Sequence, residues 1–77
     1  MNQAEVLLAQ DYFLKVVLST QEGDRDKNLT ASLNLINYLE TLSTQTLVHI
    51  STRYYGTGLS EYIHLFILPQ RDNEPHE

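Results

Sequence analysis

A chain of 77 residues that contains no cysteine must hold its fold together by burying hydrophobic side chains. Small domains are often supported by disulfides or by thiolate-bound zinc, and both of these supports need cysteine. A chain of this length buries only about 60% of the surface that its unfolded form exposes, so its stability is marginal. We expect one domain over residues 1–69. The remaining segment (QRDNEPHE) contains no hydrophobic stretch, which predicts a disordered tail over residues 70–77.

The composition indicates a folded protein without a nucleic-acid or membrane partner. Hydrophobic residues make up 42% of the chain and charged residues 19%, which is typical of a globular domain. Ten acidic residues against five basic ones give a net charge of −5, whereas binding to phosphates needs clustered Lys and Arg. No apolar run approaches the ~20 residues of a membrane span, and the N-terminus lacks the basic start of a signal peptide. We therefore expect a cytoplasmic protein.

Segments rich in β-branched and aromatic residues predict three strands, over residues 12–20, 46–55 and 60–68. The last two flank a turn at residues 56–59, which predicts a β-hairpin. A two-residue loop in this turn pairs the strands so that their hydrophobic residues share one face, as a buried face requires. The pairs are Val48 with Ile67, Ile50 with Leu65, and Thr52 with Ile63.

One helix is predicted over residues 29–43, with Asn28 or Thr30 as its N-cap. Residues 3–9 could form a second, short helix. The order of elements is then β-α-β-β, which predicts an α+β fold. The most hydrophobic strand, residues 60–68, suits the centre of a three-stranded antiparallel sheet with strand order 1-3-2, backed by the one helix. This order of elements is similar to half of a ferredoxin-like domain.

The predicted helix has more hydrophobic surface than such a sheet can cover. Its apolar side chains span about 220° of the helical wheel, whereas packing on one sheet needs only about 100°. A second copy of the chain could bury the excess, so we expect a symmetric homodimer. Its contact surface would contain Leu35, Tyr38, Leu39 and Leu42.

The sheet face away from the helix is the predicted partner-binding surface. A solvated face should be polar, yet this one gathers aromatic, His and Arg side chains, and aromatic residues and Arg are common in protein interfaces. These residues are His49, Arg53, Tyr55, Tyr62, His64 and Phe66. Acidic residues of the loop over residues 21–28 could meet a basic surface of the partner: Glu22, Asp24 and Asp26. Alternatively, residues 3–9 or a second copy of the chain could cover the face.

No motif in the sequence predicts catalysis, a cofactor or a bound metal. His49 and His64 lie close together in the predicted register, but no third ligand shares their face with them, and zinc needs at least three. The loop over residues 21–28 begins like a calcium-binding loop, but Leu29 stands where that loop needs glycine. Paired carboxylates and nucleophile motifs are also missing, so we expect a protein that is not an enzyme.

These features favour a small, acidic, non-enzymatic protein-interaction module that inhibits or regulates a larger protein. One concrete target is a nucleic-acid-handling protein, whose basic surface would attract an acidic chain. In size and charge the chain is similar to phage-encoded inhibitors such as anti-CRISPR proteins. Two alternatives remain open: a structural homo-oligomer, and a small ligand or metal binder built around His49 and His64.

Overall fold

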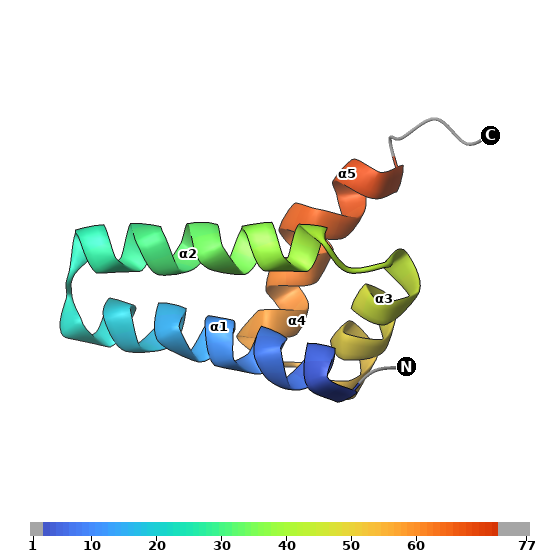
Figure 1. Cartoon of the computed structure of the whole chain (residues 1–77), viewed down its shortest axis with the longest axis horizontal. Coiled ribbons are helices and arrows are strands. Elements are labelled where there is room, and N and C mark those ends of the chain that lie inside the picture. Colours follow the sequence, from blue (N-terminus) through green and yellow to red (C-terminus); the bar gives the residue numbers. More distant parts are fainter. Residues whose placement is uncertain (1–2, 73–77) are drawn as a thin grey trace. The chain divides into compact units, whose positions relative to one another are not determined.

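The computed structural model describes residues 3–72, and every regular element in this range is a helix. In chain order the elements are α1 (Gln3–Glu22), α2 (Arg25–Glu40), α3 (Thr44–Arg53), α4 (Gly58–Tyr62), the π-helical turn η1 (Ile63–Ile67) and α5 (Leu68–Asp72). The contacts divide the chain after Thr41 into two compact units. Unit 1 holds α1 and α2, and unit 2 holds the later elements (Figure 1). None of the helices described is long and apolar enough to cross a membrane.

The predicted α+β fold is wrong, because residues 3–72 contain no strand and therefore no sheet of order 1-3-2. The three segments predicted as strands are largely helical, and they lie in α1, in α3, and in α4 with η1. The predicted helix overlaps α2 but is displaced toward the C-terminus, and the short helix at residues 3–9 is the beginning of α1. Residues 70–72 of the predicted tail belong to α5, and the rest of the tail lies outside the described residues. The single domain over residues 1–69 stays a prediction.

Unit 1 is a pair of antiparallel helices that lie side by side (Figure 1). Helix α1 ends just before Gly23, whose φ of 71° is in the left-handed region that favours glycine. There the N–H of Gly23 donates to the Thr20 carbonyl (3.1 Å) and the N–H of Asp24 donates to the Ser19 carbonyl (3.3 Å). Asp24 then caps α2, since its carboxylate accepts a hydrogen bond from the Lys27 N–H at 3.0 Å. The chain therefore reverses within two residues.

Asn28 ties the first turn of α2 to the end of α1. Its side-chain Nδ2 donates to the Val16 carbonyl (3.2 Å), to Ser19 Oγ (3.1 Å) and to Thr20 Oγ1 (2.8 Å). The two hydroxyls in turn donate to the same Val16 carbonyl, both at 2.9 Å. This network fixes the position at which α2 leaves the turn, and Ser19, at its centre, is buried.

The spacing of the buried side chains explains why both segments of unit 1 are helical. Val6 and Ala9 of α1 lie three residues apart, and Ala31, Leu35 and Leu39 of α2 lie four apart, so each set falls on one side of its helix. The sequence pattern at residues 12–18 alternates as well, which is why it also predicted a strand. In the structure, the buried Val6, Ala9 and Ser19 fall on one side of α1, which is the helical pattern.

Unit 2 packs α3 against a continuous run of α4, η1 and α5. The buried aliphatic side chains again have helical spacing, with Leu47 and Ile50 on α3 and Leu59, Ile63 and Ile67 on the facing run. These helices are too short to be stable alone, because isolated helices below about 12–15 residues are marginal in water. Their mutual packing therefore stabilises them.

The turn between α3 and α4 lies where the sequence predicted one, although it joins helices and not strands. Gly56 takes a φ of 85°, again in the left-handed region. Thr57 then caps α4, because its Oγ1 accepts a hydrogen bond from the Ser60 N–H at 3.4 Å. A glycine followed by a capping threonine ends one helix and starts the next.

Pro69 explains why η1 is a π-helical turn. In an α-helix, a proline ring clashes with the carbonyl four residues earlier and cannot donate a hydrogen bond to it. Here that carbonyl belongs to Leu65. The Leu68 N–H donates instead to the Ile63 carbonyl, five residues earlier, so the helix is wider just before Pro69. The wider turn makes room for the ring.

Leu35→Ala should destabilise the protein by about 2–5 kcal/mol, because Leu35 is fully buried and its truncation leaves a cavity. Leu33→Ala is the matched control: Leu33 lies on the same helix but is 50% exposed, so a change within about 0.5 kcal/mol is expected. Urea unfolding followed by helical circular dichroism measures both free energies. Equal losses in the two variants would contradict the observed orientation of α2.

Candidate functional site

A cluster of polar side chains lies inside unit 2, where α3 meets α4 and η1. Ser51 of α3 and Ser60 of α4 are both buried, and His64 of η1 lies at the rim with its ring partly exposed. Ser51 Oγ is hydrogen-bonded to His64 Nε2 and lies 3.2 Å from Ser60 Oγ. Ser60 Oγ also donates to the Ser51 carbonyl at 3.0 Å. Two small serines thus let the helices approach while satisfying each other's hydrogen-bonding groups.

Counting protons limits the donors in this cluster. Ser60 has one hydroxyl proton, and it is used in the bond to the Ser51 carbonyl. Ser51 also has one hydroxyl proton, and both Ser60 Oγ and an Nε2 of His64 that carries no proton can accept it. The tautomer of His64 therefore decides the direction of its bond with Ser51.

The burial of Ser51 argues against a serine nucleophile. In such a site the imidazole accepts the hydroxyl proton of a serine that the substrate can reach. Ser51 is almost entirely buried, so a substrate could not reach its hydroxyl. The cluster instead fixes the contact between α3 and α4, as a fully satisfied buried polar network does.

Ser51→Ala should destabilise the protein by about 1–3 kcal/mol, because it removes the partner of two polar groups at a buried position. Thr52→Ala is the control, since Thr52 is exposed and its hydroxyl bonds only the Val48 carbonyl within α3. Urea unfolding curves of both variants measure the difference. If Ser51→Ala were no more destabilising than Thr52→Ala, the cluster would not contribute to the stability of unit 2.

Exposed hydrophobic side chains lie beside this cluster, on η1. Leu65 is 66% exposed and Phe66 is 53% exposed. Tyr62, one turn earlier, contacts Phe66 with the ring centroids 4.9 Å apart and the ring planes tilted by 56°. Because Ile63 and Ile67 take the buried positions, Leu65 and Phe66 must lie on the outer side of the helix. We call Tyr62, Leu65 and Phe66 the η1 patch.

Three of the predicted partner-binding residues lie on the run of α4 and η1, namely Tyr62, His64 and Phe66. Tyr62 and Phe66 contact each other, whereas His64 is bonded to Ser51 on another side of the helix. In the predicted hairpin, Ser51 stands opposite His64, between the pairs Ile50 with Leu65 and Thr52 with Ile63. These two residues do meet, but their contact joins two helices. The register did not predict the buried position of Ser60 or the exposure of Leu65. A helical reading of Ile63 and Ile67 would have identified Leu65 as an outer residue.

The other predicted residues of unit 2 lie on and after α3. His49 and Arg53 are exposed on α3, and Tyr55 is exposed directly after it. Among residues 3–72, no three His, Asp or Glu side chains come together in an arrangement that could hold a metal ion. The ligand or metal site considered for His49 and His64 therefore gains no support from the geometry.

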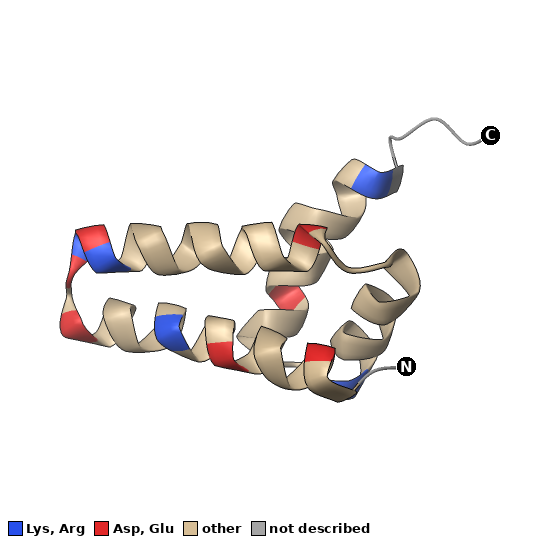
Figure 2. Ribbon diagram, viewed as in Figure 1, with Lys and Arg blue, Asp and Glu red and all other residues tan. Residues whose placement is uncertain are grey.

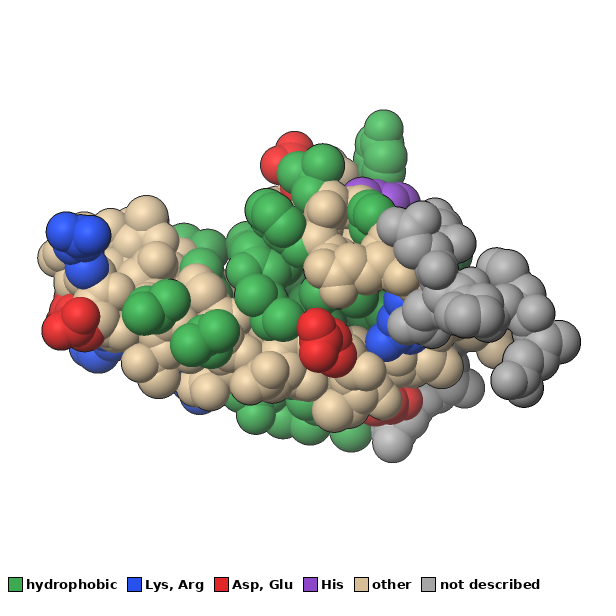
Figure 3. Space-filling view, turned by 90° about the horizontal axis from the view of Figure 1, so that it is seen from above, with side chains coloured by type: hydrophobic (Ala, Val, Ile, Leu, Met, Phe, Trp, Pro, Cys, Tyr) green, Lys and Arg blue, Asp and Glu red, His purple; other side chains and the backbone are tan. Residues whose placement is uncertain are grey.

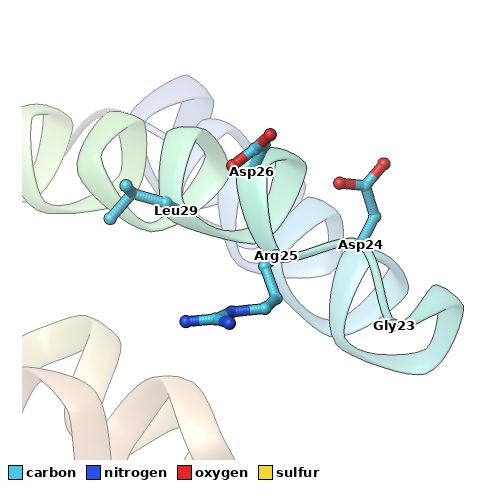
Figure 4. Close-up of a pocket in the computed structure, with 5 residues that line it drawn as sticks. All are labelled: Gly23, Asp24, Arg25, Asp26 and Leu29. Carbon is cyan, nitrogen blue, oxygen red and sulfur yellow. The ribbon is translucent and has the colours of Figure 1, made fainter.

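The predicted acidic residues surround the turn between α1 and α2, where charges of both signs gather (Figure 2). Glu22 forms an ion pair with Lys27 at 3.1 Å, and Asp24 is the N-cap of α2. The side chains of Asp24 and Asp26 point to one side of the turn, and Arg25 extends away from both (Figure 4). Three carboxylates thus share this turn with two cations, so the turn presents little net negative charge to a partner.

The residues predicted to form a dimer surface are mostly buried in the single chain. Leu35 and Leu39 of α2 and Leu42, which follows it, are buried. Tyr38 is half-buried: its ring lies 5.1 Å from the ring of Tyr12, centroid to centroid, and its hydroxyl donates to the Glu5 carbonyl at 3.4 Å. A second copy could not reach these three leucines without rearrangement, whereas Leu33 on the same helix is exposed.

Tyr38 should make the protein less stable in alkali. Burial, reinforced by the charges of Glu5 and Tyr12, raises the pKa of its phenol above the ordinary value. As pH rises past about 10, the unfolded chain loses this proton first, so the free energy of unfolding falls. Tyr38→Phe should remove that part of the fall, and Tyr55→Phe, at an 85% exposed position, should not. Urea unfolding between about pH 9 and about pH 11 measures how the free energy of unfolding changes with pH. Identical pH dependences in the parent and in Tyr38→Phe would contradict the prediction.

Comparison with protein-family models, with curated proteins and with solved structures finds no match for this chain.

Proposed function

We propose that the chain is a cytoplasmic, non-enzymatic protein-interaction module that binds a larger protein through the η1 patch and thereby inhibits or regulates it. The observation that carries this proposal is the exposure of Leu65 and Phe66 beside the ring of Tyr62, which contacts Phe66. Aromatic residues are enriched among the residues that contribute most to protein binding.

The fold around the patch supports its use as a rigid contact. Tyr62 and Phe66 hold each other in place, so little side-chain freedom is lost on binding. Immediately behind the patch, Ile63 and Ile67 are anchored in the interior of unit 2. A partner would therefore meet a preformed helical face and not a loop that must first be ordered.

The chemistry of the patch indicates the kind of partner surface. Two rings and a leucine side chain fit an apolar groove, and the phenol of Tyr62 can donate or accept one hydrogen bond at its edge. On the face drawn in Figure 3, hydrophobic side chains reach the surface in more than one place, so this patch needs a control from elsewhere in the chain. Support for a basic partner surface is weaker, because cations accompany the acidic residues of the α1–α2 turn.

Affinity capture with matched variants tests the proposal. Leu65→Ser and Phe66→Ser should each reduce recovery of the partner about tenfold or more, as expected for residues at the centre of an interface. Leu29→Ser, at a 60% exposed position of α2, should retain it. Circular dichroism of each variant shows that the fold is kept. If the parent and all three variants capture the same proteins in equal amounts, the η1 patch is not the binding surface.

A further inference from the structure

We propose that the protein also forms a symmetric dimer in which the outer faces of two α1 helices pack antiparallel. Leu7, Leu14 and Leu18 of α1 are 55%, 52% and 45% exposed. Their spacing of seven and four residues puts them within about 40° of one another on the helical wheel. Leu7 and Leu14 lie on the side of α1 away from Tyr12, whose ring contacts Tyr38 of α2. Leu18 lies at the edge of this side, where it also lines a shallow groove with Ala31 and Asn34 of α2. We call Leu7, Asp11, Leu14 and Leu18 the α1 stripe.

The α1 stripe is complementary to itself when a second copy runs in the opposite direction. Its intervals of four, three and four residues read the same from either end. If Leu7 lies level with the partner copy's Leu18, then Asp11 lies level with Leu14, and the two Leu14 side chains meet near the two-fold axis. A two-fold interface requires such reciprocal pairing: if one residue contacts a second residue of the other copy, that second residue contacts the first residue's counterpart. The interval pattern is also that of helices that pack through a narrow hydrophobic seam.

The charges beside the stripe favour the same arrangement. Asp11 and Lys15 form an ion pair within α1, at 3.1 Å, and both side chains are more than half exposed. In the antiparallel register, Lys15 of one copy lies about 1.5 Å along the axis from the level of Asp11 of the other. The four side chains then alternate in sign around the two-fold axis. A parallel arrangement would instead set Asp11 against Asp11 and Lys15 against Lys15, which is unfavourable.

A second copy fits this surface better than an unrelated helix would, because both the leucines and the charges are reciprocal. The exposed leucines of α2, Leu29 and Leu33, offer no such pattern, since α2 carries no charge between Lys27 and Glu40. The dimer does not depend on the proposed function, because the η1 patch belongs to unit 2 and the α1 stripe to unit 1.

Sedimentation equilibrium at concentrations of the order of 100 µM tests for the dimer. The parent should sediment as a dimer. Leu14→Glu places two carboxylates next to the two-fold axis and should raise the dissociation constant about tenfold or more. Leu33→Glu is the control on α2 and should remain dimeric, and circular dichroism confirms the helical content of each variant. A monomeric parent would overturn the proposal, and so would a Leu14→Glu variant that dimerises as the parent does.

An exchange of charges tests the register without removing any leucine. The Asp11→Lys variant has two cations beside the stripe, and the Lys15→Asp variant has two carboxylates. Each should dimerise more weakly than the parent, whereas an equimolar mixture of the two should form heterodimers, since every charge again faces its opposite. Differently tagged chains make the heterodimer measurable by co-purification. A mixture that associates no better than either variant alone would overturn this register.

Cysteine cross-linking tests the direction of the helices, because the native chain contains no cysteine. Leu7→Cys mixed with Leu18→Cys should give a disulfide-linked heterodimer under mild oxidation. Leu7→Cys alone should not form one, because its two sulfurs would lie roughly 16 Å apart along the axis. Rapid cross-linking of Leu7→Cys with itself would indicate parallel helices and overturn the proposal.

Discussion

The fold depends on short rows of aliphatic side chains that repeat every three or four residues. With no cysteine to form a disulfide, Leu35 and Leu39 in unit 1 and Ile50 and Ile63 in unit 2 supply much of the stabilisation through burial. The helices of unit 2 are short, so their hydrogen-bonded turns persist only while this packing holds them. The caps and the Ser51 cluster set where the helices begin and how closely they approach, but the rows decide which side of each helix faces inward.

The sequence predicted some of these elements correctly because local signals identify turns and helix ends well. The turn near Gly56 and much of α2 were found, and Gly23 was placed in a loop that proved to be a two-residue turn. The error was to assign strands to the rest. Residues 12–20 satisfy both a period of two and a period of 3.6 over a short window, and β-branched side chains favoured the wrong period. Only the buried positions of α1, which are Val6, Ala9 and Ser19, distinguish the two periods.

The candidate site shows why a wrong fold can still place two residues together. A β-hairpin and an antiparallel pair of helices both bring positions on the two sides of a turn close to each other. Ser51 and His64 therefore meet in either architecture. Whether a residue is buried or exposed does depend on the architecture. The predicted sheet placed Val48 and Leu65 on the same buried face as Ile50, but in the structure both are exposed. Exposure, which determines what a partner can touch, is the part that the sequence could not provide without the correct period.

The α1 stripe connects the stability of the protein with its assembly. A small unit can bury only a limited hydrophobic area within one chain, so its stability is low. Three half-exposed leucines on α1 could contribute further stabilisation if they were buried. If two copies bury these side chains against each other, the folded form alone takes part in the association, because the stripe exists only when residues 7–18 are helical. Association must then stabilise the folded state by mass action, and the free energy of unfolding should increase with protein concentration. Charge contributes less to this coupling, because Asp11 and Lys15 already form an ion pair within one chain. In the dimer each of these side chains gains only one further partner of opposite charge. The leucines therefore provide the affinity of the proposed dimer, and the charges select its antiparallel register.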